Sequence, residues 1–140
     1  MPITKNGKII ITKQEQLGKK TYIDFAGGVL DDGEDPENGP RREILEENGY
    51  KAGKLKLLYS IQPITRVEWS IYTFIAYDCE KVATQSLDPG EKIRLKLIDF
   101  DEFVGITSGD NIRDLDTINR VLRAKLDLQK MDELKKLFAR

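Results

Sequence analysis

The chain has 140 residues, with 24 Asp+Glu, 23 Lys+Arg, one Cys and no His, and its length fits one domain, residues 1–140, with its own hydrophobic core. The absence of His excludes the Ser-His-Asp triad, the Cys-His nucleophile pair and the HExxH zinc site, while a single Cys excludes a disulfide framework and thiolate-rich zinc sites. A metal ion must therefore be held mainly by oxygen ligands, as Mg²⁺, Mn²⁺ and Ca²⁺ are, and the net charge of −1 argues against a general nucleic-acid binder.

The chain begins with two predicted strands. Residues 8–12 are a β-branched run that follows the turn signal Asn6-Gly7, and residues 21–25 alternate before a small-residue stretch that contains two glycines. The next segment, residues 29–39, is rich in turn-forming and acidic residues and is predicted to be a loop.

A helix is predicted over residues 41–48, because this run contains no breaker and ends at Gly49, a typical residue just past a helix. Pro40 has no backbone N–H, and proline costs about 3 kcal/mol inside a helix. We therefore expect the helix proper to start at Pro40, with Asn38 or Gly39 as its cap.

The second half of the chain predicts three more strands and then helices. The predicted strands are residues 55–61, 70–78 and 93–100, with a loop over residues 83–90. Apolar residues recur at helical spacing from position 115 to 126, and a second helical run is predicted over residues 131–138. Because strands and helices mix without a regular βαβ alternation, we predict an α+β fold or an α/β/α sandwich.

Acidic residues concentrate between positions 31 and 47, where eight acids face two bases, a local net charge of −6. Three of these acids, Glu43, Glu46 and Glu47, lie at i, i+3 and i+4 and so project from one helix face. Their charges repel each other, and a hard cation such as Mg²⁺ or Mn²⁺ would offset that repulsion by binding their oxygens. The alternative interpretation of the triplet alone is a solvated acidic helix face.

A longer pattern around this triplet is more specific. Residues 28–50 read GVLDDGEDPENGPRREILEENGY, which fits G-x5-E-x7-R-E-U-x-E-E-x-G-U, where U is a bulky apolar residue. Seven of the nine fixed positions demand one particular residue, so a chance match along the chain has a probability below about 10⁻⁶. This segment, called the box below, resembles the catalytic box of the Nudix hydrolases.

The resemblance implies an α/β/α sandwich around a mixed sheet, in which the box folds as loop–helix–loop. It also implies that Mg²⁺ or Mn²⁺ assists hydrolysis of a nucleoside diphosphate linked to another moiety. Carried onto this chain, it implies that Glu43, Glu46, Glu47 and the carbonyl of Gly27 are the metal ligands. The three Glu residues would thereby belong to the catalytic machinery.

The other box residues are implied to support these ligands. Arg42 would orient a box carboxylate by a charge-assisted hydrogen bond, and Glu34 would brace the loop against the helix. Gly28 and Gly49 would permit tight or left-handed backbone turns.

The flanks of the box resemble the ADP-ribose pyrophosphatase branch of the family. Asp24 matches an acidic position of that branch, Glu68 lies in a stretch similar to its Pro-containing loop, and Glu91 matches the position of a catalytic Glu. Arg66 could clamp a phosphate with its guanidinium fork. Asp24, Arg66 and Glu68 are thus candidate substrate contacts, and Glu91 is a candidate general base or extra ligand. Solvated surface side chains are the alternative for Arg66 and Glu91.

The first interpretation of function is hydrolysis of ADP-ribose or a nucleotide sugar, in which water attacks one phosphorus and a carboxylate accepts its proton. A house-cleaning nucleoside triphosphate pyrophosphohydrolase would use the same machinery. A non-catalytic nucleotide sensor on a Nudix fold and a generic acidic interaction domain are alternatives of other classes.

The expected partner is a small-molecule nucleotide. We expect no nucleic acid partner and no membrane insertion, because no apolar run approaches the roughly 20 residues of a membrane helix. A cytoplasmic location is expected from the lack of a signal-peptide pattern and from the single Cys. Both a monomer and a homodimer stay open.

Overall fold

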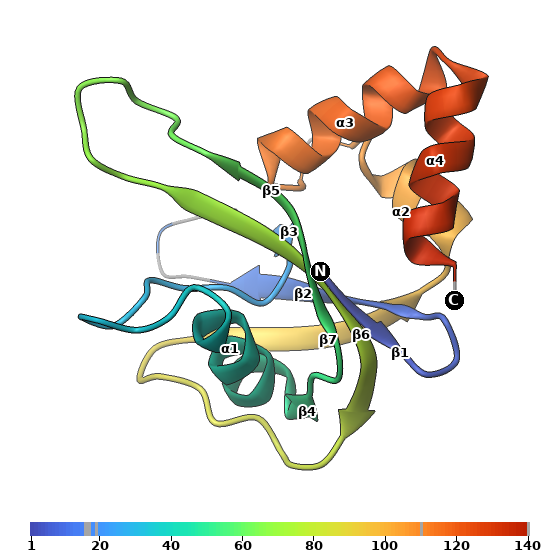
Figure 1. Ribbon diagram of the computed structural model, residues 1–140. Coiled ribbons are helices and arrows are strands. Elements are labelled where there is room, and N and C mark those ends of the chain that lie inside the picture. The colour runs from blue at the N-terminus through green and yellow to red at the C-terminus, as the bar shows by residue number, and fades with distance from the viewer. Residues whose placement is uncertain (16–17, 19, 110, 140) are drawn as a thin grey trace.

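Figure 1 shows the computed structural model, which describes residues 1–15, 18, 20–109 and 111–139. Within these residues the strands are β1 (Pro2–Thr4), β2 (Ile9–Glu15), β3 (Tyr22–Asp24), β4 (Tyr50–Lys51), β5 (Leu55–Ile61), β6 (Ile71–Lys81) and β7 (Lys92–Ile98). The helices are α1 (Asn38–Asn48), α2 (Phe100–Ile106), α3 (Leu115–Lys125) and α4 (Leu128–Phe138). Every helix in the described part of the chain is too short or too polar to cross a bilayer.

All seven strands join one mixed sheet. Strand β2 pairs antiparallel with β1, β3 and β7, and β6 pairs antiparallel with β4 and β5. The two halves meet where β1 runs parallel to β6. The prediction of an α+β fold is confirmed.

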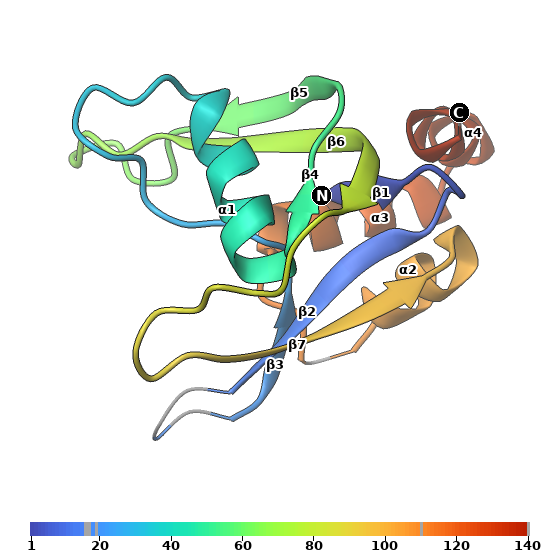
Figure 2. The ribbon, with the colours of Figure 1, turned by 90° about the horizontal axis from the view of Figure 1, so that it is seen from below.

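Helices cover both faces of this sheet, and the alternation of β2 shows how (Figures 1 and 2). Ile9 and Ile11 pack into a cluster with Phe103, Val121 and Phe138, which come from the three C-terminal helices. Ile10 points to the opposite face and packs into a second cluster with Ile44 of α1. Because successive side chains of a strand alternate between faces, one β-branched run serves both core layers.

The prediction of a strand over residues 93–100 is wrong at its C-terminal end. Strand β7 ends at Ile98, and the side chain of Asp99 accepts a hydrogen bond of 2.8 Å from the backbone N–H of Glu102. Asp99 is therefore the N-cap of helix α2. The helix delivers Phe103 to the core, where its ring lies 5.0 Å from that of Phe138. Strands β1 and β4 were also not predicted, since runs of three and two residues are too short for a periodic signal.

Helix α1 starts at Asn38, two residues earlier than predicted, with Glu37 as the N-cap and no side-chain capping bond. Pro40 is consequently the third helical residue. Its missing N–H removes no helical bond, because the first four N–H groups of a helix lack intrahelical acceptors. The backbone carbonyl of Asp35 accepts a 2.8 Å hydrogen bond from the Asn38 N–H instead of a side-chain cap.

Gly49 ends α1 in the left-handed conformation, with φ 66° and ψ 25°, as predicted for the residue after the helix. Its N–H donates to the Leu45 carbonyl at 2.8 Å. A Cβ at this position would lie only 2.2 Å from the carbonyl oxygen of Ala83. Both the backbone angle and the close approach therefore require glycine here.

Gly49→Ala is expected to lower the free energy of unfolding by about 2–4 kcal/mol, because the strain of a left-handed alanine adds to the clash with Ala83. Urea unfolding followed by circular dichroism measures the change. Gly105→Ala is the matched control, since a Cβ at Gly105 meets no atom within 4 Å. Equal losses in the two variants would contradict this account of Gly49.

Candidate functional site

Helix α1 and three loops lie at the same end of the molecule (Figures 1 and 2). The loops comprise residues 25–37, the hairpin loop 62–70 between β5 and β6, and residues 82–91 between β6 and β7. The box residues lie in the first loop and α1, apart from Gly49 and Tyr50, which follow the helix. A catalytic site is therefore expected at this end of the molecule.

The guanidinium of Arg42 holds the first loop against α1. It binds both carboxylate oxygens of Glu34, at 3.2 Å through Nε and 3.1 Å through Nη2, and Nη2 also donates to the Val29 carbonyl at 3.1 Å. Glu34 in turn accepts a 3.0 Å hydrogen bond from the Asp31 N–H. The Arg42 hydrogen bond is the main cause that lowers the pKa of Glu34, and the same contact raises the pKa of Arg42. Glu34 therefore connects the loop to α1 through Arg42.

Arg42 also contacts two of the three predicted ligands. Its Nη1 donates to Glu43 at 2.8 Å and to Glu46 at 3.2 Å, and the second pair is an i, i+4 ion pair along the helix. In this conformation no three acidic side chains of the described residues converge into a preassembled metal cluster. The guanidinium is therefore the positive charge that partners Glu43 and Glu46 here.

Gly28 lies directly against the carboxylate of Glu43. A Cβ at Gly28 would be 2.1 Å from Glu43 Oε1 and 2.7 Å from its Cδ. The φ angle of Gly28 is not in the left-handed region, which distinguishes it from Gly49. Glycine at the start of the box therefore leaves room for the Glu43 carboxylate in its observed position, and any larger residue would displace the end of that side chain.

Glu47 is the most buried of the three acids, with 7% of its surface exposed, and its Oε2 has no hydrogen-bond partner. Burial raises the pKa of Glu47 from its ordinary 4.5 to about 8, and the charges of Glu43 and Glu91 add to the increase. A hydrogen bond with the backbone of Gly27 acts in the opposite direction. Glu47 thus lies beside Gly27, the residue proposed to contribute a backbone ligand.

The structure brings two further predicted residues to this group. The charge of Glu91 contributes to the raised pKa of Glu43 as well as to that of Glu47, although burial is the first cause in both. Asp24, at the end of β3, also adds to the pKa of Glu47, and burial raises its own pKa. Loop 82–91 and strand β3 therefore place two carboxylates near α1. Neither of these carboxylates belongs to the contiguous box.

Arg66 and Glu68 are positioned differently. Both are exposed on hairpin loop 62–70, and in the described part of the chain neither forms an ion pair with a box carboxylate. Their assignment as substrate contacts stays a prediction.

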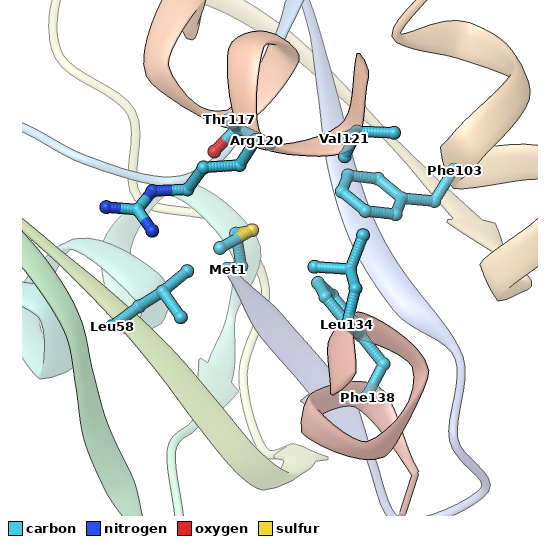
Figure 3. A pocket seen from close by; sticks show the side chains of 8 residues that line it. All are labelled: Met1, Leu58, Phe103, Thr117, Arg120, Val121, Leu134 and Phe138. Atoms are coloured by element: carbon cyan, nitrogen blue, oxygen red, sulfur yellow. The ribbon is translucent and has the colours of Figure 1, made fainter. Parts of the chain in front are cut away.

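A small cavity elsewhere does not belong to this group. It has a volume of about 10 Å³ and lies among α3, α4 and the sheet, where apolar side chains such as Leu134 and Phe138 line it (Figure 3). No carboxylate lines it. It is a packing void in the core rather than a nucleotide site.

The donor set around Glu47 fits a hard divalent cation. All the side-chain ligand atoms are carboxylate oxygens, and one of them is buried without a partner. Burial and then the neighbouring acids raise the pKa of both Glu43 and Glu47. Buried unpaired carboxylates are unfavourable unless a positive charge compensates them. A divalent cation supplies that charge and prefers oxygen ligands.

Comparison with known protein families identifies the family of this chain. A family model described as "NUDIX domain" matches residues 1–120. The chain belongs to the NUDIX domain family. Nudix hydrolases act on small nucleotide substrates and generally need divalent metals.

One curated relative of this Nudix chain is an "ADP-ribose pyrophosphatase" from Bacillus subtilis (strain 168), 41% identical over 56 residues. The aligned stretch covers 39% of this chain and 30% of that relative. The similarity is thus confined to less than a third of the relative's length.

Solved structures share the fold of the Nudix chain. A crystal structure of an "ADP compounds hydrolase" superposes with a TM-score of 0.73 at 17% identity, covering 93% of this chain and 70% of that one. A MutT structure from work on Aliivibrio salmonicida and Vibrio cholerae gives a TM-score of 0.60 at 16% identity, covering 87% of this chain and 93% of that one. A MutT NUDIX hydrolase from Burkholderia pseudomallei gives 0.56 at 22% identity, with 72% and 85% covered. At these identities the likeness supports the fold alone.

Loss of stability as pH rises from about 5 to about 8 is expected for the metal-free protein, because the raised pKa of Glu47 means that the folded state keeps a proton that the unfolded chain releases. Stability is then fully present below the ordinary pKa of 4.5 and falls as pH rises to about 8. Glu47→Gln removes this effect, so its free energy of unfolding should gain about 2 kcal/mol or more over wild type between about pH 5 and about pH 8. Thermal unfolding in EDTA across this range measures the difference, and a pH-independent difference would contradict the assignment.

Proposed function

We propose that the protein is a Nudix pyrophosphohydrolase that uses Mg²⁺ or Mn²⁺ to hydrolyse a nucleoside diphosphate linked to another moiety. The observation that carries the proposal is the buried carboxylate of Glu47, held on one face of α1 with Glu43 and Glu46 inside a complete box. ADP-ribose or a nucleotide sugar is the first-choice substrate. The flanks of the box and the name of the Bacillus subtilis relative support that choice.

The box residues would hold the metal. Glu43, Glu46 and Glu47 would contribute carboxylate oxygens, and the Gly27 carbonyl would contribute a backbone oxygen. A divalent cation, when bound, neutralises charge on the pyrophosphate and lowers the pKa of an attacking water. Arg42 keeps Glu43 and Glu46 oriented through its contacts of 2.8 and 3.2 Å.

Glu91 is proposed to accept the proton of the attacking water at its carboxylate. Its charge lies close enough to Glu43 and Glu47 to raise the pKa of both. It also stands on a loop outside the helix, so that proton transfer and metal binding are assigned to different elements. Asp24, Arg66 and Glu68 are proposed as substrate contacts.

Product analysis tests the substrate class. With Mg²⁺, the protein should convert ADP-ribose to AMP and ribose 5-phosphate, because water attacks one phosphorus of the pyrophosphate. A screen of ADP-ribose, nucleotide sugars, dinucleoside polyphosphates and nucleoside triphosphates ranks the substrates by kcat/KM. Preferred release of inorganic pyrophosphate from triphosphates would overturn the choice in favour of the house-cleaning class. No turnover of any compound with Mg²⁺ or Mn²⁺ would overturn the proposed enzyme.

Glu46→Gln and Glu47→Gln should each lower kcat by about 10²-fold or more while the fold is kept, as expected for loss of a metal ligand. Steady-state kinetics at saturating Mg²⁺ measures turnover, and circular dichroism checks folding. Glu37→Gln is the matched control, because Glu37 is an exposed acid at the other end of α1 with no side-chain capping bond. Turnover near that of wild type in the two ligand variants would refute the ligand assignment.

A further inference from the structure

The side chain of Gln85 forms a bridge that no sequence motif indicates. Its Nε2 donates to the backbone carbonyl of Glu47 at 2.6 Å and to that of Ile93 at 3.2 Å. A primary amide has two N–H donors, so both are used. One partner is the backbone of a proposed metal ligand in α1, and the other is near the start of β7.

Loop 82–91 is docked on the end of α1 around this bridge. The backbone N–H of Ser86 donates to the Glu46 carbonyl at 2.8 Å, and those of Val82 and Ala83 donate to the Gly49 carbonyl at 3.0 and 3.1 Å. These carbonyls belong to the helix terminus, where intrahelical donors are lacking. The first half of the loop is thus fixed to the backbone of the helix that carries the box acids.

Glu91 lies between Gln85 and Ile93 along the chain. It closes a tight turn, in which its N–H donates to the Asp88 carbonyl and its carboxylate accepts from the Asp88 N–H, both at 3.1 Å. The turn begins three residues after Gln85 and ends two residues before Ile93. The Gln85 side chain holds both Gln85 and Ile93 close to the Glu47 backbone. This restricts where Glu91 can lie relative to α1.

We infer that Gln85 is a positioning residue that sets the distance between Glu91 and the box carboxylates by tying the Glu47 carbonyl to the Ile93 carbonyl. The inference rests on the proposed function, since it assigns Gln85 to the placement of the proton acceptor. Figure 2 shows the β6–β7 connection passing along α1 before it enters β7. Gln85 touches no reacting atom in this assignment.

Gln85→Met removes both donors and keeps a side chain of similar length. We expect kcat for ADP-ribose to fall at least about tenfold while KM changes less than about twofold, because loss of the bridge affects proton transfer and not nucleotide binding. Gln85→Asn keeps the amide but cannot reach both carbonyls, and it should show the same pattern. The Asn variant also tests the inference if the Met variant does not fold.

Lys81→Met is the matched control. Lys81 Nζ donates to the Asn48 carbonyl at 2.7 Å, at the same helix end, but it makes no link to β7. This variant should keep kcat within about twofold of wild type if the bridge to Ile93 is what matters. Equal losses of kcat in Lys81→Met and Gln85→Met would show that general support of the helix end explains both, and would overturn the inference.

A double-mutant cycle with Glu91 separates positioning from stability. If Gln85 acts through Glu91, Gln85→Met should cost less than about twofold in a Glu91→Gln background. If the losses of kcat from the two substitutions multiply in the double variant, the inference is overturned. The proposed function stays intact in that case, provided that Glu46→Gln shows its expected loss of about 10²-fold or more.

Hydrogen exchange gives a readout that does not depend on activity. Gln85→Met should raise the exchange rate of the Ser86 and Glu91 amides by about tenfold or more relative to wild type, with strand β2 unchanged. If wild type hydrolyses none of the screened nucleotides, the proposed function fails, and unchanged exchange of these two amides would then overturn the bridge by itself.

Discussion

The contact between the Arg42 guanidinium and the surrounding carboxylates is the interaction on which the site depends. Five fixed donors in one plane let a single side chain bind Glu34, Glu43 and Glu46 at once. A lysine would bring the same charge but not this geometry. Because Glu34 lies in the loop and the other two acids lie in α1, the Arg42 guanidinium also fixes the position of the loop on the helix.

This arrangement explains how the chain tolerates a local charge of −6 in one segment. Arg42 neutralises the outer acids, whereas Glu47 lies in the interior with a pKa of about 8. Stability and the proposed metal-ligand role therefore conflict at Glu47, since its ionised form is unfavourable in the fold and is the form that a cation would bind. Such conflicts concentrate at functional sites.

The sequence was most informative where the residues of the site are contiguous. Glu43, Glu46 and Glu47 follow from helical spacing, since one helix sets their geometry. Glu91 was proposed only through the family resemblance, because its approach to α1 depends on the path of loop 82–91. Gln85 had no signal, since a single loop glutamine belongs to no periodic pattern and its carbonyl partners are backbone atoms. Helix α2 was also missed, but the sequence does contain a signal for its start. Asp99 and Glu102 have the spacing of a helix N-terminal capping pattern.

The docked loop has a consequence for the polarity of α1. A helix ends in exposed carbonyls that carry a partial negative charge, and acids in its last turn are normally unfavourable. Helix α1 has no basic residue there to offset this, yet that turn carries Glu46 and Glu47. Loop 82–91 covers those carbonyls with N–H groups, including the Ser86 amide and the Gln85 side chain. Together with the Lys81 ammonium, which donates to the Asn48 carbonyl at 2.7 Å, the loop thus offsets the partial negative charge of the helix end, which lets acidic residues occupy a position that a free helix end would disfavour.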